Sequence, residues 1–151
     1  MTIIGKPIEI LLVEDNEGDI GLIEEVFEEA KIRNKLHIAE NGEEAMLFLH
    51  GKKKFSGSQR PDIILLDLNL PKKDGREVLR EIREDYDLEN IPVVILTTSG
   101  NEKDVLRTYD LHANAYITKP LDFNQFIRVV ESIVNFWLRV VQLPSKYDRK
   151  L

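Results

Sequence analysis

Residues 63–75, IILLDLNLPKKDG, hold the strongest structural signal in this sequence. Four apolar residues, Ile63 to Leu66, run directly into Asp67, and a polar loop with proline and glycine leads to a helical pattern after Gly75. A run of four branched residues bounded by a loop is typical of a buried strand. Open α/β sheets bind their ligands at the C-terminal ends of such strands. We therefore expect Asp67 to occupy a functional position.

The same pattern recurs along the chain, because short apolar runs alternate with segments of helical periodicity. The predicted strands cover residues 8–13, 36–39, 62–66, 93–96 and 115–118, and the predicted helices begin near residues 17, 41, 75, 102 and 122. Strands that alternate with helices form a parallel sheet with helices on both faces. The sequence therefore predicts one α/β domain with a doubly wound, five-stranded parallel sheet.

The composition excludes several classes of protein. The chain has 151 residues, of which 42% are hydrophobic, with a formal net charge of −6 and no cysteine. The negative charge argues against a nucleic-acid partner, because phosphate binding needs a basic face. The lack of cysteine excludes disulfides and thiol chemistry and fits a cytoplasmic protein. No apolar run approaches the roughly 18 residues that span a bilayer, so we expect no membrane segment.

The last predicted helix is unusually long. Its apolar residues recur every three or four positions from Phe123 to Val141, until Pro144 ends the pattern. A helix of about 20 residues is about 30 Å long, whereas five-residue strands span about 17 Å, so the helix should overhang the sheet. The overhang would expose Trp137, Val140 and Val141 as a surface for self-association. Alternatively, the tail folds back and buries this stripe against its own domain.

Acidic residues follow two strands that this fold places side by side. Glu14 and Asp15 come directly after the first strand, and Asp67 follows the third. Converging at the switch point of the sheet, these carboxylates repel one another unless a cation lies between them. A site with this small number of protein ligands suits Mg²⁺ better than Ca²⁺, because Mg²⁺ keeps several of its waters when it binds. The sequence favours a metal site over the alternative, which is that these acids are solvated loop residues.

Two further strand ends add hydroxyls and a cation at the same edge. The fourth strand runs into Thr97-Thr98-Ser99-Gly100, whose hydroxyl and N–H groups can hold an anion, and the fifth runs into Lys119. This combination suits an aspartate that accepts a phosphoryl group. Asp67 would be the nucleophile, Lys119 and the metal would neutralise charge, and the Thr97 hydroxyl would donate. Taken singly, Lys119 would be a solvated surface residue.

Together these residues resemble the receiver domains of two-component response regulators, over residues 8–140. The matching motifs occur in the order expected for the family: LLVEDN with Glu14 and Asp15, LLDLNLPKKDG with Asp67, VVILTTS with Thr97, and YITKP with Lys119 and Pro120. The resemblance implies the flavodoxin-like receiver fold, with strand order 2-1-3-4-5. It also implies that Asp67 takes a phosphoryl group from a phosphohistidine on a sensor histidine kinase.

The family's metal site and switch can be carried over to this chain. The resemblance implies that Asp15, Asp67 and the main-chain carbonyl of Asn69 hold Mg²⁺, for which Mn²⁺ can substitute, and that Glu14 acts through water. Thr97 and Tyr116 match the switch pair, in which phosphorylation draws the hydroxyl to the phosphoryl oxygens and turns the ring inward. This would change the surface formed by the fourth helix, fifth strand and fifth helix. The Lys119–Pro120 bond is implied to be cis.

A narrower resemblance is to the single-domain regulators that partner bacterial phytochromes. It lies in LNLPKKDGREVL, in the extended loop at residues 51–61 and in FWL at residues 136–138. It implies a phytochrome-type kinase as partner, an elongated last helix and a homodimer formed through that side. The candidate contact residues are Phe136, Trp137, Val140 and Val141. Thr98 departs from the smaller residue common there in the wider family.

The resemblance also predicts the domain organisation. We expect residues 1–151 to form one receiver domain, with a core over about 8–122 and an extended last helix and tail over about 122–151. The residues after the last helix are too few for a DNA-binding output domain, so output would come from protein contacts.

Three other functions are compatible with parts of this pattern. A phosphorelay intermediate would pass the phosphoryl group from Asp67 to a histidine-containing protein. A phosphatase of the haloacid dehalogenase type usually has a second acid two residues after its nucleophile, where this chain has Asn69. A flavodoxin-like nucleotide binder needs a glycine-rich loop after the first strand, where this chain has acids. We therefore expect a phosphoacceptor signalling protein and not an enzyme with turnover.

Overall fold

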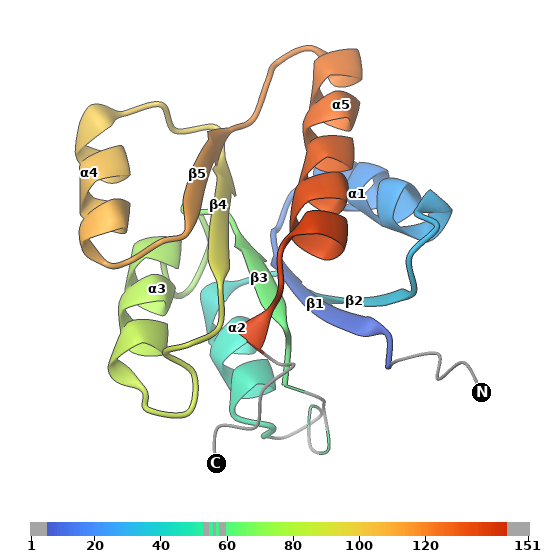
Figure 1. Ribbon diagram of the computed structural model, residues 1–151. Helices are drawn as coiled ribbons and strands as arrows, with labels where there is room; N and C mark the ends of the chain where they lie inside the picture. The colour runs from blue at the N-terminus through green and yellow to red at the C-terminus, as the bar shows by residue number, and fades with distance from the viewer. Residues whose placement is uncertain (1–5, 53–54, 56, 58–59, 145–151) are drawn as a thin grey trace.

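The computed structural model describes residues 6–52, 55, 57 and 60–144. Its strands are β1 (Ile8–Val13), β2 (Asn34–Ala39), β3 (Ile63–Leu66), β4 (Val93–Thr97) and β5 (Ala115–Thr118). They pair in parallel in the order β2-β1-β3-β4-β5. The predicted doubly wound sheet and its strand order are confirmed (Figure 1).

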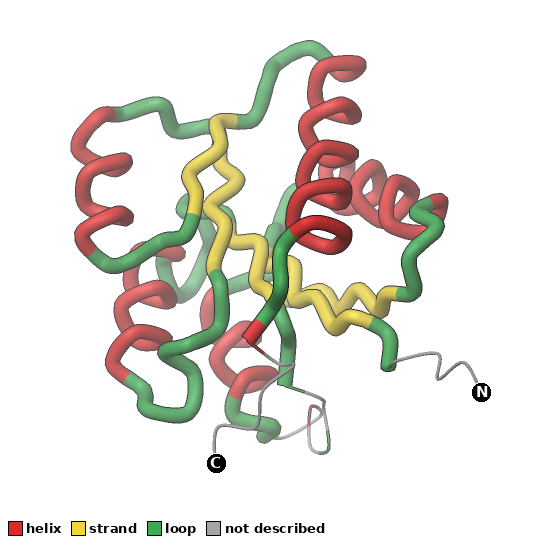
Figure 2. The backbone as a smooth tube through the Cα atoms, viewed as in Figure 1, coloured by secondary structure: helices red, strands yellow, loops and turns green. Residues whose placement is uncertain are grey.

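Helices cover both faces of this sheet. Helices α1 (Glu17–Glu29) and α5 (Phe123–Ile133) lie on one side, and α2 (Gly42–Leu49), α3 (Gly75–Glu84) and α4 (Glu102–Asp110) on the other (Figures 1 and 2). Each begins after a residue whose side chain accepts a backbone N–H of the first turn, namely Asn16, Asn41, Asp74, Asn101 and Asp122. Within the described ranges, every helix falls short of the length and apolar character needed to cross a bilayer.

The central strands supply both halves of the core. Along β3, Ile64 and Leu66 face the cluster under α2 and α3, whereas Ile63 and Leu65 face the cluster under α1 and α5. Residues of β1 and β4 alternate in the same way. Because both faces are covered, these strands are apolar except for Glu9 in β1 and Thr97 at the end of β4. The polar residues that gather at their C-terminal ends are therefore the candidates for chemistry.

Helix α4 is packed differently from the others. The structure describes all of its residues, and of these Thr108 is buried. Leu106 and Tyr109, two of its largest apolar side chains, are exposed. Since burial of an apolar face normally holds a helix on a sheet, α4 must be held largely by other contacts.

The last helix is elongated, as predicted, but its end is less exposed than predicted. Helix α5 continues into the π-helical turn η2 (Val134–Val140), where the Val141 N–H donates to the Phe136 carbonyl five residues earlier. Phe136 and Val140 are 53% and 69% exposed. Trp137 and Val141 pack partly buried against the core. The predicted exposure is confirmed for Val140 and is wrong for Trp137 and Val141, because the chain beyond the extension returns to the core at Leu143.

Candidate functional site

The C-terminal ends of β1 and β3 bring three carboxylates together. Val13 pairs with Leu66, so the residues that follow these two strands are neighbours. One carboxylate oxygen from each of Glu14, Asp15 and Asp67 lies within 4.8 Å of the others. Glu14 and Asp67 are buried and Asp15 is exposed. The predicted convergence of these acids is confirmed.

Lys119 lies buried among these acids. Its Nζ donates to Glu14, donates to Asp19 Oδ2 at 2.9 Å, and lies 3.4 Å from Asp67 Oδ2. Burial by itself lowers the pKa of Lys119, but the hydrogen bonds to Glu14 and Asp19 outweigh it and hold the pKa above its usual value. Lys119 is therefore an ammonium at 6% exposure and not a solvated surface lysine.

Glu14 is held by both of its oxygens. Oε1 accepts from Lys119, and Oε2 accepts the backbone N–H groups of Asp15 and Asn16 at 3.1 and 3.2 Å. Burial raises the pKa of Glu14 to about 7, an effect that Lys119 opposes and the charge of Asp67 reinforces. The site therefore has more negative charge than one lysine balances.

The donor atoms of this cluster fit a divalent cation. All are carboxylate oxygens, the ligands that hard cations prefer, and the excess of negative charge favours a cation among them. Asp15 is exposed, so that solvent reaches one side of the cluster. A bound cation there could keep water among its ligands, as Mg²⁺ does.

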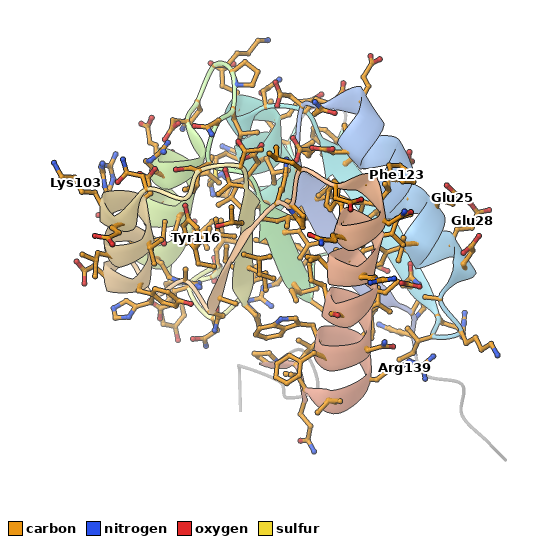
Figure 3. The ribbon with its side chains drawn as sticks, turned by 90° about the horizontal axis from the view of Figure 1, so that it is seen from above. Glu25, Glu28, Lys103, Tyr116, Phe123 and Arg139 are labelled. Atoms are coloured by element: carbon orange, nitrogen blue, oxygen red, sulfur yellow. The ribbon has the colours of Figure 1, made fainter. Side chains whose placement is uncertain are left out.

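Thr97 and Tyr116 both contact Ser99, in the loop between β4 and α4. The buried Thr97 Oγ1 accepts the Ser99 N–H at 3.5 Å, and the Tyr116 hydroxyl donates to the Ser99 carbonyl at 2.6 Å. Burial raises the pKa of Tyr116, so the hydroxyl stays protonated and able to donate. The ring, which lies on the α4 side of the molecule (Figure 3), thus already contacts this loop.

Two further residues carried over from the family have different outcomes. The Asn69 N–H donates to Asp67 Oδ1 at 3.2 Å, which brings the main chain of Asn69 next to the Asp67 carboxylate. The prediction for Pro120 is wrong: no peptide bond between described residues is cis, so the Lys119–Pro120 bond is trans. An X–Pro bond favours trans by about 0.5–1 kcal/mol, and Lys119 reaches the acids without the cis form.

Gly75 allows α3 to begin directly against the peptide of Asp67. A Cβ at this position would lie 2.1 Å from the Asp67 carbonyl oxygen and 2.7 Å from Leu68 Cα. The Gly75 N–H instead donates to the Leu68 carbonyl at 2.9 Å. The first turn of α3 therefore fixes the backbone from which the Asp67 side chain projects.

Sequence reasoning missed three residues near the site. Asp19, in the first turn of α1, is a partner of Lys119 at 2.9 Å. Arg76, at the start of α3, forms an ion pair with Asp104 of α4 at 2.8 Å. The position of Asp19 in a first helical turn next to the acids that follow β1 could have marked it as a residue of the site. No sequence pattern predicts the contact between Arg76 and Asp104.

Comparison with known proteins agrees with this geometry. The family described as response regulator receiver domain matches residues 10–131. The chain is 50% identical to response regulator Rcp1 of Synechocystis sp. over 136 residues, which are 90% of this chain and 92% of Rcp1. The crystal structure of the Mn²⁺-bound form of Rcp1 superposes with a TM-score of 0.89, covering 91% of this chain and 99% of that one.

Two other solved structures extend the comparison. The phosphorylated cyanobacterial phytochrome response regulator RcpA is 47% identical, with a TM-score of 0.89 and coverage of 92% and 99% of the two chains. The bacteriophytochrome response regulator AtBRR is 37% identical, with a TM-score of 0.71 and coverage of 91% and 100%. The family match runs from within β1 into α5 and includes the acids and the lysine at the strand ends. This chain therefore belongs to the response regulator receiver domain family, whose members partner sensor histidine kinases.

Proposed function

We propose that this chain accepts a phosphoryl group on Asp67 from a phosphohistidine of a sensor histidine kinase. The observation that carries the proposal is a buried aspartate with Lys119 at 3.4 Å and two further carboxylates within 4.8 Å. A carboxylate oxygen of Asp67 attacks phosphorus, the bond to the histidine nitrogen breaks, and an acyl phosphate forms. Lys119 is placed to pair with an oxygen of the transferred group.

We propose Mg²⁺ as the cofactor, with Mn²⁺ as a substitute. Asp15, Asp67 and the main-chain carbonyl of Asn69 would hold it, and Glu14 would act through water. In support, both oxygens of Glu14 are already engaged, by Lys119 and by two backbone N–H groups, which disfavours direct ligation. When bound, the cation would supply positive charge to the phosphoryl oxygens.

The response to phosphorylation would pass through Thr97 and Tyr116. A phosphoryl group on Asp67 offers acceptors to the buried Thr97 hydroxyl at the end of β4. Movement of Thr97 would change the loop whose Ser99 carbonyl holds Tyr116. The surface of α4, β5 and α5 would then change its contacts, because α4 is held there by little apolar burial.

We infer that this surface, extended by η2, forms a homodimer. A mainly apolar groove of about 390 Å³ lies between β5 and the last helix, lined by residues that include Ile117, Val129, Ile133, Phe136 and Trp137. Val140 is exposed nearby on η2. Apolar surface of this kind favours association. A phytochrome-type kinase is the partner we propose, because the similar proteins RcpA and AtBRR are described as phytochrome response regulators.

Two alternatives are less well supported. As a phosphorelay intermediate, the chain would pass the phosphoryl group from Asp67 to a histidine-containing protein, using the same site in reverse. A phosphatase with Asp67 as nucleophile would need a general acid beside it, and the corresponding residue, Asn69, carries an exposed amide. That residues 1–151 form one receiver domain stays a prediction.

Labelling by a small phosphodonor tests the assignment. With Mg²⁺ and acetyl phosphate, intact-mass spectrometry should find one added phosphoryl group per chain. We expect Asp67→Asn to abolish this gain, and Asp110→Asn, which alters an exposed aspartate at the end of α4, to leave it unchanged. Unchanged labelling in Asp67→Asn would refute the proposed function.

Turnover separates the alternatives. A phosphatase would hydrolyse phosphomonoesters continuously, whereas a receiver would stop near one phosphoryl group per chain. Transfer from the labelled chain to a histidine phosphotransfer protein would favour the relay. Comparing the initial rates of transfer from purified phytochrome-type and other sensor kinases would test the proposed partner.

A further inference from the structure

A continuous series of polar contacts links α3, α4 and β5. Arg76, in the first turn of α3, donates Nε to Asp104 Oδ1 and Nη2 to Asp104 Oδ2, both at 2.8 Å. Asp104 Oδ2 also accepts the Ser99 hydroxyl at 2.7 Å. The Ser99 carbonyl in turn accepts the Tyr116 hydroxyl at 2.6 Å. One guanidinium is thus connected to the tyrosine of β5 through two residues.

Arg76 also holds the loop that follows Asp67. Its Nη1 donates to the two carboxylate oxygens of Asp74 at 3.0 and 3.1 Å and lies 3.5 Å from the Leu68 carbonyl oxygen. Asp74 is the N-cap of α3, and Leu68 follows the phosphoacceptor directly. The guanidinium therefore joins the segment after Asp67 to the first turn of α4.

The pair formed by Arg76 and Asp104 is well suited to fix a position. It is bidentate, which sets the orientation of both side chains, and they are only 19% and 17% exposed, which limits screening by solvent. In addition, hydrogen bonds from Arg76 and Ser99 lower the pKa of Asp104 to about 2, so the carboxylate is charged at neutral pH.

Apolar burial at the start of α4 is limited to the partly buried Val105. Thr108, the buried residue of this helix, lies near its C-terminal end, and Leu106 is exposed. A helix with so little apolar burial can shift at low cost unless polar contacts hold it. The contact of Asp104 with Arg76 supplies such a restraint at the end of α4 nearest Ser99.

We propose that Arg76 and Asp104 are positioning residues of the switch, which hold Ser99 where its carbonyl accepts the Tyr116 hydroxyl. The proposal rests on the proposed function, in which Tyr116 carries the effect of phosphorylation to the surface of α4, β5 and α5. We call the Tyr116 ring inward when its hydroxyl donates to the Ser99 carbonyl. With the pair of Arg76 and Asp104 intact, this inward position is favoured before Asp67 is phosphorylated. Without it, the first turn of α4 and Ser99 are released and the ring turns outward more often.

Fluorine NMR of the full chain labelled with 3-fluorotyrosine tests this, with the Tyr116 resonance assigned through Tyr116→Phe. In the absence of phosphodonor, Arg76→Met and Asp104→Asn should each reduce the ratio of inward to outward ring by about fivefold or more, as for typical coupling between sites. Arg76→Lys, which cannot form the bidentate contact, should give a smaller reduction. The double variant should lose no more than the larger single effect, because both changes remove one interaction.

Two matched variants provide the controls. Arg80→Met alters an exposed arginine of α3 whose contact with Glu77 is 3.8 Å long, and Glu102→Gln alters an exposed acid in the first turn of α4. Neither should move the Tyr116 resonance. Beryllofluoride with Mg²⁺, as a phosphoryl mimic, should restore the inward signal in Arg76→Met, which a change in overall stability alone would not produce.

Several outcomes would overturn the proposal. The first is a Tyr116 resonance that does not differ between the unmodified protein and the folded Arg76→Met and Asp104→Asn variants. The second is a shift of this resonance in Arg80→Met as large as the shift in Arg76→Met. If the single variants do not fold, the exchanged pair Arg76→Asp with Asp104→Arg must restore both the fold and the inward signal. If Asp67 of the unmodified protein is labelled but the substitutions at Arg76 and Asp104 do not move the Tyr116 ring, only this inference is contradicted. If the substitutions move the ring but Asp67 of the unmodified protein is not labelled, the proposed function is contradicted.

Discussion

Lys119 is the buried cation of the site and offsets part of its negative charge. It is buried, and its ammonium contacts Glu14 and Asp19 and lies 3.4 Å from Asp67. Carboxylates at this depth are costly unless they are paired, so Lys119 serves both the stability of the fold and the proposed chemistry.

Lys119→Met should therefore have two effects. Labelling of Asp67 by acetyl phosphate should slow by about 10²- to 10³-fold, because the transferred oxygens lose a preorganised cation. The free energy of unfolding at neutral pH should fall by about 3–5 kcal/mol, since buried carboxylates lose their partner. Mg²⁺ should recover part of that loss. Urea denaturation with and without Mg²⁺ checks this, with the exposed Lys103→Met as control. Equal labelling rates would contradict the role of Lys119.

Asp104 gives a pH dependence that can be assigned to one residue. Its pKa is lowered from 3.8 to about 2 in the folded chain, first by the hydrogen bond from Arg76. A lowered pKa stabilises the fold above the unfolded value near 4, and this contribution is lost as the pH falls toward 2. The stability difference between the unmodified protein and Asp104→Asn should shrink by about 2 kcal/mol from pH 6 to pH 2. Urea denaturation of both proteins at several pH values measures this difference in the free energy of unfolding. A difference that stays constant from pH 6 to pH 2 would contradict the role of Asp104.

At the scale of the elements, the start of α3 is tightly constrained. Gly75 lies where any Cβ would collide with the Asp67 carbonyl and Leu68 Cα, both backbone atoms that cannot rotate away. The start of α3 and the backbone geometry of Asp67 are therefore linked through one residue.

Gly75→Ala should lower the free energy of unfolding by about 1–3 kcal/mol, as overpacking typically does, and should also slow labelling of Asp67. Gly21, inside α1, has open space where a Cβ would lie, with no atom within 4 Å, so Gly21→Ala should instead raise stability by about 0.5–1 kcal/mol. Urea midpoints and labelling rates for both variants test the pair. If Gly75→Ala and Gly21→Ala change the urea midpoint and the labelling rate in the same way, the proposed steric constraint at Gly75 is wrong.

At the scale of the whole molecule, the chemistry and the proposed dimer surface lie at different places. The acids lie at the C-terminal ends of the strands, while the exposed Phe136 and Val140 lie on the extension of the last helix, toward the end marked by Arg139 in Figure 3. Any coupling between them must pass along β5 and α5. The groove between these two elements is therefore where phosphorylation could change self-association.

Phe136→Ser with Val140→Ser should weaken the proposed dimer, because both apolar side chains are exposed and contribute little to the monomer core. Sedimentation velocity over a range of concentrations should show the shift toward monomer, and Glu131→Gln, an exposed change on α5, should not cause it. An unmodified protein that is monomeric at every concentration, with and without a phosphoryl mimic, would contradict the dimer.

The sequence by itself was sufficient for the sheet and for the acids at its edge. Apolar runs such as Ile63–Leu66 are local patterns, and in parallel sheets the residues after adjacent strands are neighbours. The sequence alone is therefore enough to group Glu14, Asp15 and Asp67. The elongated last helix followed from its periodicity for the same reason.

Only the tertiary structure decided which side chains meet between elements. The contacts of Lys119 with Asp19 and of Arg76 with Asp104 join residues 100 and 28 positions apart, and depend on how helices are set against the sheet. The partial burial of Trp137 and Val141 depends on packing in the same way. Periodicity determines which face of an element is apolar, whereas the relative placement of elements, which depends on the whole core, determines the partner of each polar side chain.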